Sequence, residues 1–278
     1  MRSLFLSALS IILLFTACQK EIDWSQGQSP DQLLVKVRSI TGSDSSIINF
    51  TYDAQRRLVL ETTVGVSSGN SLNGTLKVNR NSTGIILTTV QKSDALTAAG
   101  VDSILTTFYY NSANSKYTAA TSLLDIGGFT VTDSVEFTYD GTGKISADKH
   151  WFVTGLIAPF EALSNAYSYS ATGTNLLTIV QSAPTAPGLP SVPVSTQTFT
   201  YDAKTNPLIL KNEAILLNRY TYFSANNSTK VDFVDQTDPT NNFTTDNVYK
   251  YNFISKPDSC TSTQSNTGAL TVSKFYYQ

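Results

Sequence analysis

Few residues of this chain could carry out acid–base chemistry. His150 is the one histidine among 278 residues, so a Ser-His-Asp triad or a histidine-rich metal site lacks the side chains that it needs. We interpret His150 as a surface or half-buried residue rather than a general base. A glycoside hydrolase instead needs two carboxylates across one cleft. Beyond the N-terminal segment the glutamates are scattered along the chain, and nothing in their spacing brings two together: Glu61, Glu136, Glu161 and Glu213. The sequence therefore predicts no enzyme, with a carboxylate-dependent hydrolase of envelope or dietary polymers as an alternative.

One polar loop offers ligands for a metal ion. The segment from Asp235 to Asp246 carries carboxylate and amide oxygens of the kind that bind calcium. It lacks the central glycine and the final glutamate of an EF-hand loop. We interpret it as a polar turn, and we predict neither a metal nor another cofactor.

Aromatic side chains are the strongest candidates for contact with a ligand. In the pairs Tyr109-Tyr110 and Tyr276-Tyr277, adjacent rings on a strand must point to opposite faces of the sheet. An exposed ring on a weakly charged sheet can stack against a sugar or a protein surface. We predict Tyr109, Tyr277 and Trp151 as candidate stacking residues.

The aromatic residues belong to strands that end in tight turns. Val135, Phe137 and Tyr139 alternate with polar residues, which is typical of a strand buried on one face. Asp140 suits the start of a turn, where its carboxylate can accept a main-chain N–H, and Gly143 suits a left-handed position that closes a hairpin. The segment predicts a β-hairpin.

Versions of this hairpin recur along the chain. Close copies follow Phe50 and Phe199, and the aromatic positions return at a nearly constant step of about 30 residues, which is typical of a repeated supersecondary unit. The repeat positions are 52, 80, 110, 139, 169, 201, 222, 251 and 277. They predict an all-β fold, an antiparallel meander of hairpins curled into a roll, a barrel or a two-layer arrangement. The segment Asp94–Gly100 interrupts the pattern and predicts one or two helical turns.

The motif Tyr139-Asp140-x-x-Gly143-Lys144-Ile145 resembles the Tyr-Asp repeat of Rhs-type proteins, and more closely the hairpin-repeat lipoproteins of unknown function common in Bacteroidota. The resemblance covers roughly residues 35 to 278. Arg56 and Asn206 stand near positions where the turn glycine would be. The lipoprotein family implies an envelope location and an all-β fold, and it carries over no catalytic residues.

The N-terminal segment has the features of an export signal. Arg2 precedes an apolar run from Leu4 to Phe15 that is too short for a membrane span, which needs about 20 residues. Phe15-Thr16-Ala17-Cys18 resembles a bacterial lipobox, so we expect residues 1–17 to be a signal peptide and Cys18 to carry acyl chains such as palmitate. Residues 18–31 read as a flexible tether, and residues 32–278 as one domain. Because Glu21 and Asp23 resemble an acidic export signal, we expect outer-membrane anchoring, with the cell surface favoured over the periplasmic face.

Composition and short motifs complete the expectations. A net charge of −2 leaves no basic stripe for nucleic acid. Cys260 has no disulfide partner once Cys18 is acylated. Ser103 and Ser134 lie in Asp-Ser-aliphatic motifs that resemble O-glycosylation sites of this phylum. We predict a lipid-anchored envelope module that binds a glycan or a protein partner without catalysis. A curled sheet that carries an apolar ligand is a further alternative. A membrane-spanning barrel is disfavoured, because the expected strands are shorter than the ~9–11 residues that such strands need.

Overall fold

The structure is a computed structural model that describes residues 32–126, 129–153 and 158–278. Residues 33–278 form one compact unit. Its elements are β1 (Leu34–Thr41), β2 (Asp44–Tyr52), β3 (Leu58–Ser67), β4 (Asn70–Ser71), β5 (Gly74–Arg80), β6 (Ile86–Ser93), α2 (Asp94–Ala98), β7 (Ile104–Asn111), β8 (Lys116–Ile126), β9 (Phe129–Tyr139) and β10 (Ile145–Val153). They continue as β11 (Phe160–Tyr169), β12 (Leu176–Pro184), β13 (Ser191–Thr205), α3 (Asn212–Leu216), the 3-10 helices η1 (Tyr220–Tyr222) and η2 (Pro239–Asn241), β14 (Asn226–Asp235), β15 (Phe243–Tyr251), β16 (Pro257–Gln264) and β17 (Leu270–Tyr277).

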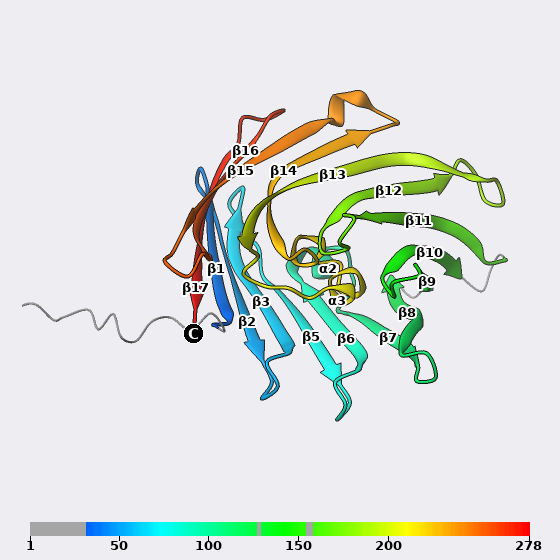
Figure 1. Ribbon diagram of the computed structural model, residues 1–278. Coiled ribbons are helices and arrows are strands. Elements are labelled where there is room, and N and C mark those ends of the chain that lie inside the picture. The colour runs from blue at the N-terminus through cyan, green and yellow to red at the C-terminus, as the bar shows by residue number, and fades with distance from the viewer. Residues whose placement is uncertain (1–31, 127–128, 154–157) are drawn as a thin grey trace, which may run out of the picture. The chain divides into compact units, whose positions relative to one another are not determined.

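The strands form a closed antiparallel barrel. Each long strand pairs with the next one along the chain, and the two-residue β4 pairs only with β3. The last strand returns to the first, with Thr41 opposite Thr271 and a 2.6 Å hydrogen bond between their hydroxyls. The predicted all-β meander of hairpins is confirmed, and a barrel is the form that it takes (Figure 1).

The predicted turn chemistry is also confirmed. The Asp140 carboxylate accepts the main-chain N–H groups of Thr142 and Lys144 at 2.8 and 3.0 Å, and Gly143 has φ +85°. Asp53, Asn81 and Asn252 use their side-chain oxygens in the same way in three other hairpins. Arg56 takes the left-handed position of its turn at φ 64°, in place of glycine.

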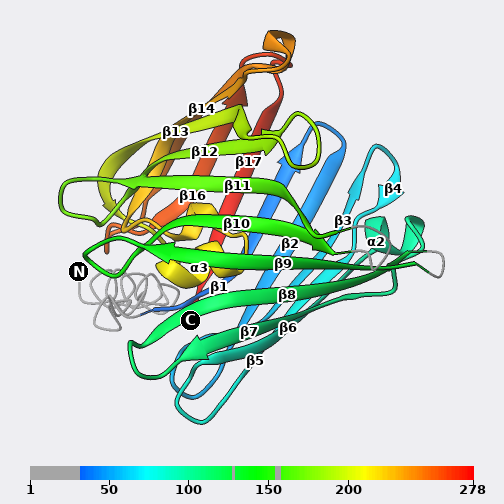
Figure 2. The same ribbon diagram turned by 90° about the vertical axis from the view of Figure 1, so that its right-hand side faces the viewer.

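These turns lie together at one end of the barrel, which we call the base; the opposite end is the rim. β1 begins and β17 ends at the base, so the chain enters the barrel there. Figure 2 shows the base with the C-terminus and α3, and the rim with α2. Helix α2 confirms the predicted helical turns, with Ser93 as its N-cap.

A tyrosine marks the base end of most repeats, inside the barrel. The Tyr52 hydroxyl donates to the Leu34 carbonyl at 2.6 Å, and the Tyr277 hydroxyl donates to the Pro257 carbonyl at 2.7 Å. The same contact joins Tyr169 to Ile145 and Tyr201 to Leu176. The first residues of the returning strands are fully buried beside these rings: Leu34, Leu58, Ile86, Ile145, Leu176 and Pro257.

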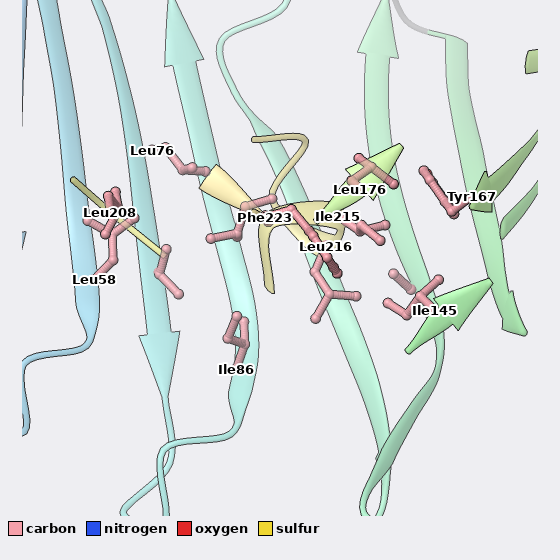
Figure 3. Close-up of a cluster of buried hydrophobic side chains, with 14 of the residues drawn as sticks. Leu58, Leu76, Ile86, Ile145, Tyr167, Leu176, Leu208, Ile215, Leu216 and Phe223 are labelled. Carbon is pink, nitrogen blue, oxygen red and sulfur yellow. The ribbon is translucent and has the colours of Figure 1, made fainter. Parts of the chain in front are cut away.

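An insertion between β13 and β14 fills the base half of the barrel. We call residues 206–225, which contain α3 and η1, the plug. Ile215 and Phe223 of the plug are buried against wall residues such as Ile86 and Ile145 (Figure 3). The plug therefore closes the core with a segment that belongs to no hairpin.

The plug corrects two predictions. Tyr222 lies in η1 and is not a repeat position; the step from Tyr201 to Tyr251 is one repeat enlarged by the insertion. The close hairpin copy predicted after Phe199 is replaced by the plug, in which Leu208 is buried. Asp202 starts no hairpin turn, and it accepts hydrogen bonds from the Tyr251 hydroxyl and the Asn227 main-chain N–H.

The outer wall is mixed in polarity: exposed apolar side chains such as Val64, Val248 and Val272 stand on it, and it carries charges between the base and the rim. Hydroxyl side chains of Thr and Ser alternate with the inward residues, and charged side chains stand among them: Lys77, Glu136, Lys149, Lys230, Asp232 and Lys250. Strands β3, β8 and β9 have 10 or 11 residues, so the expectation of shorter strands was wrong. None of the helices in the described residues has the length and apolar character to cross a membrane.

Candidate functional site

The inner wall changes character from base to rim. Its base half is packed with aromatic and aliphatic side chains around the plug. Towards the rim the inward residues are mostly hydroxyl and amide side chains: Ser39, Ser46, Thr63, Gln91, Thr106, Ser122, Gln181, Gln197, Asn247, Ser262 and Ser273. Most of these are half-buried, and Gln91 is exposed, so solvent reaches the rim half. This half can offer hydrogen bonds to a polar ligand.

A cavity of about 530 Å³ opens at the rim where β3 separates from β5. The pairing of β3 with β5 ends where Thr63 lies opposite Gly74. Beyond Thr63, the end of β3 pairs with the two-residue β4 instead. Strand β6 and α2 complete the cavity. Its side chains are hydroxyls, an amide, one aliphatic group and three charges: Thr62, Thr63, Val64, Asn73, Thr75, Lys92, Ser93, Asp94, Thr97 and Asp102. We call it the rim cavity.

A smaller cavity of about 170 Å³ lies on the inner side of the same wall. It reaches Glu61, Gln91 and Arg219, and it shares Thr63, Gly74 and Ser93 with the rim cavity. Gly74 pairs with Thr63 on one side and Ser93 on the other. Because all three residues are small, the wall between the two cavities is thin.

The charges of the rim cavity are paired within the protein. The Asp94 carboxylate accepts the Asn73 main-chain N–H at 2.9 Å. A hydrogen bond from Ser71, together with those from Asn73, lowers the pKa of Asp94 below its usual value. Lys92 Nζ lies 3.2 Å from Asp102 Oδ2. Asp94 therefore stays ionised at neutral pH, and it can accept hydrogen bonds from a ligand but has no proton to give.

His150 lies inside the barrel, between two carboxylates. Its Nδ1 is 3.0 Å from Asp133 Oδ2, and its Nε2 is 3.4 Å from Asp148 Oδ1. Burial would lower the pKa of His150, but the hydrogen bonds to both aspartates raise it to about 9. Asp148 is buried and also accepts from Asn165 at 2.8 Å and from the Tyr167 hydroxyl at 2.5 Å. At neutral pH the ring is therefore a half-buried cation that neutralises one of two carboxylates.

Each glutamate that could have joined a catalytic pair is bound to another side chain or is exposed on the outer wall. Glu61 binds Arg219 through both oxygens, at 2.7 and 3.0 Å. Glu213 binds Arg80 through both oxygens, each at 2.7 Å. Glu136 is exposed on the outer wall, and Glu161 accepts a 2.6 Å bond from Ser191 and pairs with Lys149. Sequence reasoning missed both arginine partners, because they lie about 130 to 160 positions away along the chain.

The predicted stacking residues do not form one site. Tyr109 faces outward from β7 and is 49% exposed, with its hydroxyl 3.3 Å from Thr121. Trp151 faces outward from β10, next to Lys149, and its indole N–H is buried without a partner among the described residues. In the C-terminal pair the outward ring is Tyr276, and Tyr277 faces the barrel interior.

The remaining predicted sites do not line the rim cavity, or lie outside the described residues. Ser103 is half-buried beside Asp102, and Ser134 is half-buried on the outer wall opposite Trp151. Their glycosylation stays a prediction. The signal peptide, Cys18 and the whole tether, residues 1–31, lie outside the described residues. Cys260 is buried.

The side chains of the polar loop after β14 form hydrogen bonds within the loop. The Asp235 carboxylate accepts from Thr237, Asp238 and Asn241, and the bonds from Thr237 and Asn241 lower its pKa. Among the described residues there is no group of three His, Cys, Asp or Glu side chains placed to hold a metal ion.

Comparisons with known proteins reveal similarity of fold. No protein-family model matches the sequence, and no sequence match was found among curated proteins. A porin-like protein from Bacteroides uniformis ATCC 8492 superposes with a TM-score of 0.56 over 88% of this chain and 98% of its own, at 14% identity. A porin-like protein from Bacteroides vulgatus ATCC 8482 gives 0.41 over 89% and 99%, at 11% identity. The Photorhabdus luminescens Tc holotoxin pore gives 0.32 over 84% of this chain and 13% of its own, at 12% identity. The chain thus shares its barrel fold with the first of these proteins.

Proposed function

We propose that this protein is a lipid-anchored module of the bacterial outer membrane, held through acylated Cys18, that binds a glycan in the rim cavity without catalysing a reaction. The observation that carries the proposal is the lining of that 530 Å³ cavity. Its volume falls in the range of small-molecule sites, about 300–1,000 Å³. We favour display on the cell surface over the periplasmic face.

The lining suits a neutral, hydroxyl-rich ligand. Thr62, Thr75 and Thr97 each present a hydroxyl that both donates and accepts hydrogen bonds, next to a methyl group. Sugars alternate hydroxyl groups with C–H faces, so they match such a surface. Asn73 adds an amide, and Lys92 and Asp102 add charged partners. The half-buried hydroxyl and amide groups of the inner wall extend the same chemistry towards the barrel interior.

The charges argue against a hydrolase at this place. A glycoside hydrolase needs one carboxyl that keeps its proton near neutral pH, which requires a raised pKa. Hydrogen bonds from Ser71 and Asn73 instead lower the pKa of Asp94. Asp102 is 88% exposed at its side chain and pairs with Lys92, so it is not enclosed in a cleft opposite Asp94.

The packing argues against an apolar carrier. The apolar half of the interior is occupied by the plug, whose Ala214, Ile215 and Phe223 are at most 3% exposed. The rim half is lined mainly by hydroxyl and amide groups, which an apolar ligand would leave without partners.

The outer wall supports a barrel that stands in water beside the membrane. Lys77, Glu136 and Lys149 face outward between base and rim, where a bilayer would meet apolar side chains. An acyl anchor at Cys18 would hold such a barrel at the membrane without insertion. The envelope location also agrees with the fold of the Bacteroides uniformis porin-like protein.

A glycan array followed by calorimetry tests the proposal on the mature chain, residues 19–278, which retains the whole closed barrel. Thr97→Trp places a large ring in the rim cavity, and Ala98→Trp places the same ring on the same helix outside its lining. We expect a glycan to bind the wild type and Ala98→Trp, and Thr97→Trp to lose at least about tenfold in affinity, or about 1.4 kcal/mol. An empty array, or equal affinity of both variants, would contradict the proposal; a protein captured from intact envelopes would then favour a protein partner.

A further inference from the structure

The two ends of the barrel differ in charge. Among the described residues, cations gather at the base: Arg56, Arg57, Lys116, Lys144, Lys204 and Lys211. Of the base carboxylates, Asp53, Asp140 and Asp202 accept main-chain N–H groups, Asp53 also pairs with Arg57 at 2.7 Å, and Asp258 stands at the start of β16. The rim loops carry the opposite charge: Asp44, Asp94, Asp102, Asp235 and Asp238, with Lys92. A protein with a net charge of −2 is therefore polarised along its barrel axis.

A cavity of about 350 Å³ lies at the base, between the hairpin turns 142–144 and 173–174 and the plug. We call it the base pocket. Among the described residues that line it, Lys144 and Lys211 carry charge and none is a carboxylate. Lys144 Nζ donates to the Thr142 hydroxyl at 2.7 Å. A side chain at Gly173 would overlap with the Lys144 ammonium group, so the glycine leaves room for this cation.

The second lysine is held in a strained backbone conformation. Lys211 has φ 53° and ψ −131°, which glycine adopts freely and other residues adopt at a cost of about 1–3 kcal/mol. Asn212 follows it and fixes the plug to the adjacent hairpin, donating to the Gly143 carbonyl at 2.9 Å. The chain therefore keeps a cation at the mouth of this pocket where a glycine would be more stable.

Apolar side chains stand beside the base cations. Phe253, in the β15–β16 turn, is 64% exposed, and Ile209, which lines the base pocket, is 40% exposed. Exposed aromatic and aliphatic groups next to lysines are typical of surfaces that rest on a membrane interface.

The chain outside the described residues joins the barrel at this same end. β1 begins at Leu34 in the base, so the segment that follows Cys18 attaches there. Fourteen residues, 19–32, span at most about 50 Å when extended. An acyl anchor at Cys18 therefore attaches the barrel to the membrane by its base end, within about 50 Å of the lipid surface.

From these observations we propose that the base faces the anchoring membrane, and that the base pocket binds the phosphate of an anionic lipid headgroup between Lys144 and Lys211. This orientation turns the acidic rim, with the rim cavity, away from the membrane. The inference rests on the proposed envelope location but not on glycan binding. Its test needs no acyl chain, so its failure would leave the proposed glycan site untouched.

The test measures sedimentation of the unacylated mature chain, residues 19–278, with vesicles of phosphatidylcholine alone or mixed with phosphatidylglycerol. We expect binding to the mixed vesicles only, and weaker binding as salt rises. Each lysine near an anionic surface contributes about fivefold to binding. Lys144→Gln/Lys211→Gln should therefore reduce binding about 25-fold, whereas the rim variant Lys92→Gln should bind like the wild type.

Lys211→Gly separates binding from folding. It removes the cation at a position that prefers glycine, so its urea midpoint should be equal to or above that of the wild type while vesicle binding falls about fivefold. Equal binding to neutral and anionic vesicles would overturn the proposal. So would wild-type binding by the double lysine variant. If calorimetry showed that inorganic phosphate binds while the chain binds neither kind of vesicle, the base pocket would be a site for a free anion. The proposal that it binds a lipid headgroup would then be overturned.

Discussion

The hydroxyl of Tyr52 donates a 2.6 Å hydrogen bond to the main-chain carbonyl of Leu34, which ties the end of one strand to the start of its neighbour. Because Leu34 is fully buried, its carbonyl has no ready access to water. The contact recurs at Tyr169, Tyr201 and Tyr277, so one side-chain type fixes the base of the barrel repeat by repeat.

Tyr52→Phe should lower the free energy of unfolding by about 1 kcal/mol, because the carbonyl of Leu34 loses its partner. Tyr109→Phe removes a hydroxyl from an exposed ring on the outer wall and should change little. Urea unfolding of both variants measures the difference. Equal effects of the two substitutions would show that the hydrogen bonds from these tyrosine hydroxyls to main-chain carbonyls do not stabilise the barrel.

Gly143→Ala should destabilise the barrel by about 1–2 kcal/mol, because alanine at φ +85° is forced into the left-handed region. Gly141 is the matched control: it lies in the same turn, its φ is outside that region, and nothing lies within 4 Å of an added Cβ. Gly141→Ala should leave the urea midpoint close to that of the wild type. A comparable loss in both variants would contradict the turn geometry.

Arg80→Met should loosen the plug. Arg80 is 3% exposed at its side chain and holds Glu213 of α3 through two 2.7 Å bonds. Breaking a buried ion pair from one side costs about 3 kcal/mol. Thermal unfolding should show this loss, and limited proteolysis should cut within residues 206–225 earlier than in the wild type.

The control for the plug variant is the exposed pair Lys230–Asp232, for which Lys230→Met should cost less than about 1 kcal/mol. If Arg80→Met left both the melting temperature and the cleavage pattern unchanged, the ion pair would not hold the plug in place.

His150 should make stability depend on pH. Its pKa is raised to about 9 by Asp133 and Asp148 in the folded protein, against about 6.5 when unfolded. A raised pKa contributes stability fully below pH 6.5 and loses it as pH rises through 9, a change of about 3 kcal/mol at most. His150→Gln should lower stability near neutral pH and flatten the profile between pH 6.5 and 9. An unchanged slope in His150→Gln would contradict the ion cluster.

The sequence predicted local structure well where one repeat contains its own determinants. Asp140 and Gly143 specify a turn, and Val135, Phe137 and Tyr139 specify a buried face, because neighbours along the chain make these contacts. The sequence analysis missed the plug because Tyr222 lies 29 residues before Tyr251 and so resembles a repeat position; the short step of 21 residues from Tyr201 was the one signal of the insertion. Only the partners across the barrel, such as Arg80 for Glu213, reveal that this segment lies inside it.

The candidate site was less predictable than the fold. The rim cavity forms where β3 leaves β5, and it is lined by threonines that no motif distinguishes from those of the outer wall. The sequence analysis predicted Asp94 only as the start of a short helix and assigned it no role in binding. His150 was expected to be half-buried, as it is, but its two carboxylates come from different strands and only the register of the sheet brings them together.

The base, the rim and the interior that holds the plug exist only if the barrel closes between its first and last strands. Thr41 and Thr271 are directly opposite each other across that seam, with hydroxyls 2.6 Å apart. Opposite residues of an antiparallel pair have Cα atoms about 4.5–5.5 Å apart, which suits a disulfide. The most direct measurement is therefore mild oxidation of Thr41→Cys/Thr271→Cys, followed by thiol counting and non-reducing electrophoresis. We expect the two introduced cysteines to form a disulfide rapidly in the folded protein; if both of these thiols stay free under these conditions, the barrel does not close at this seam.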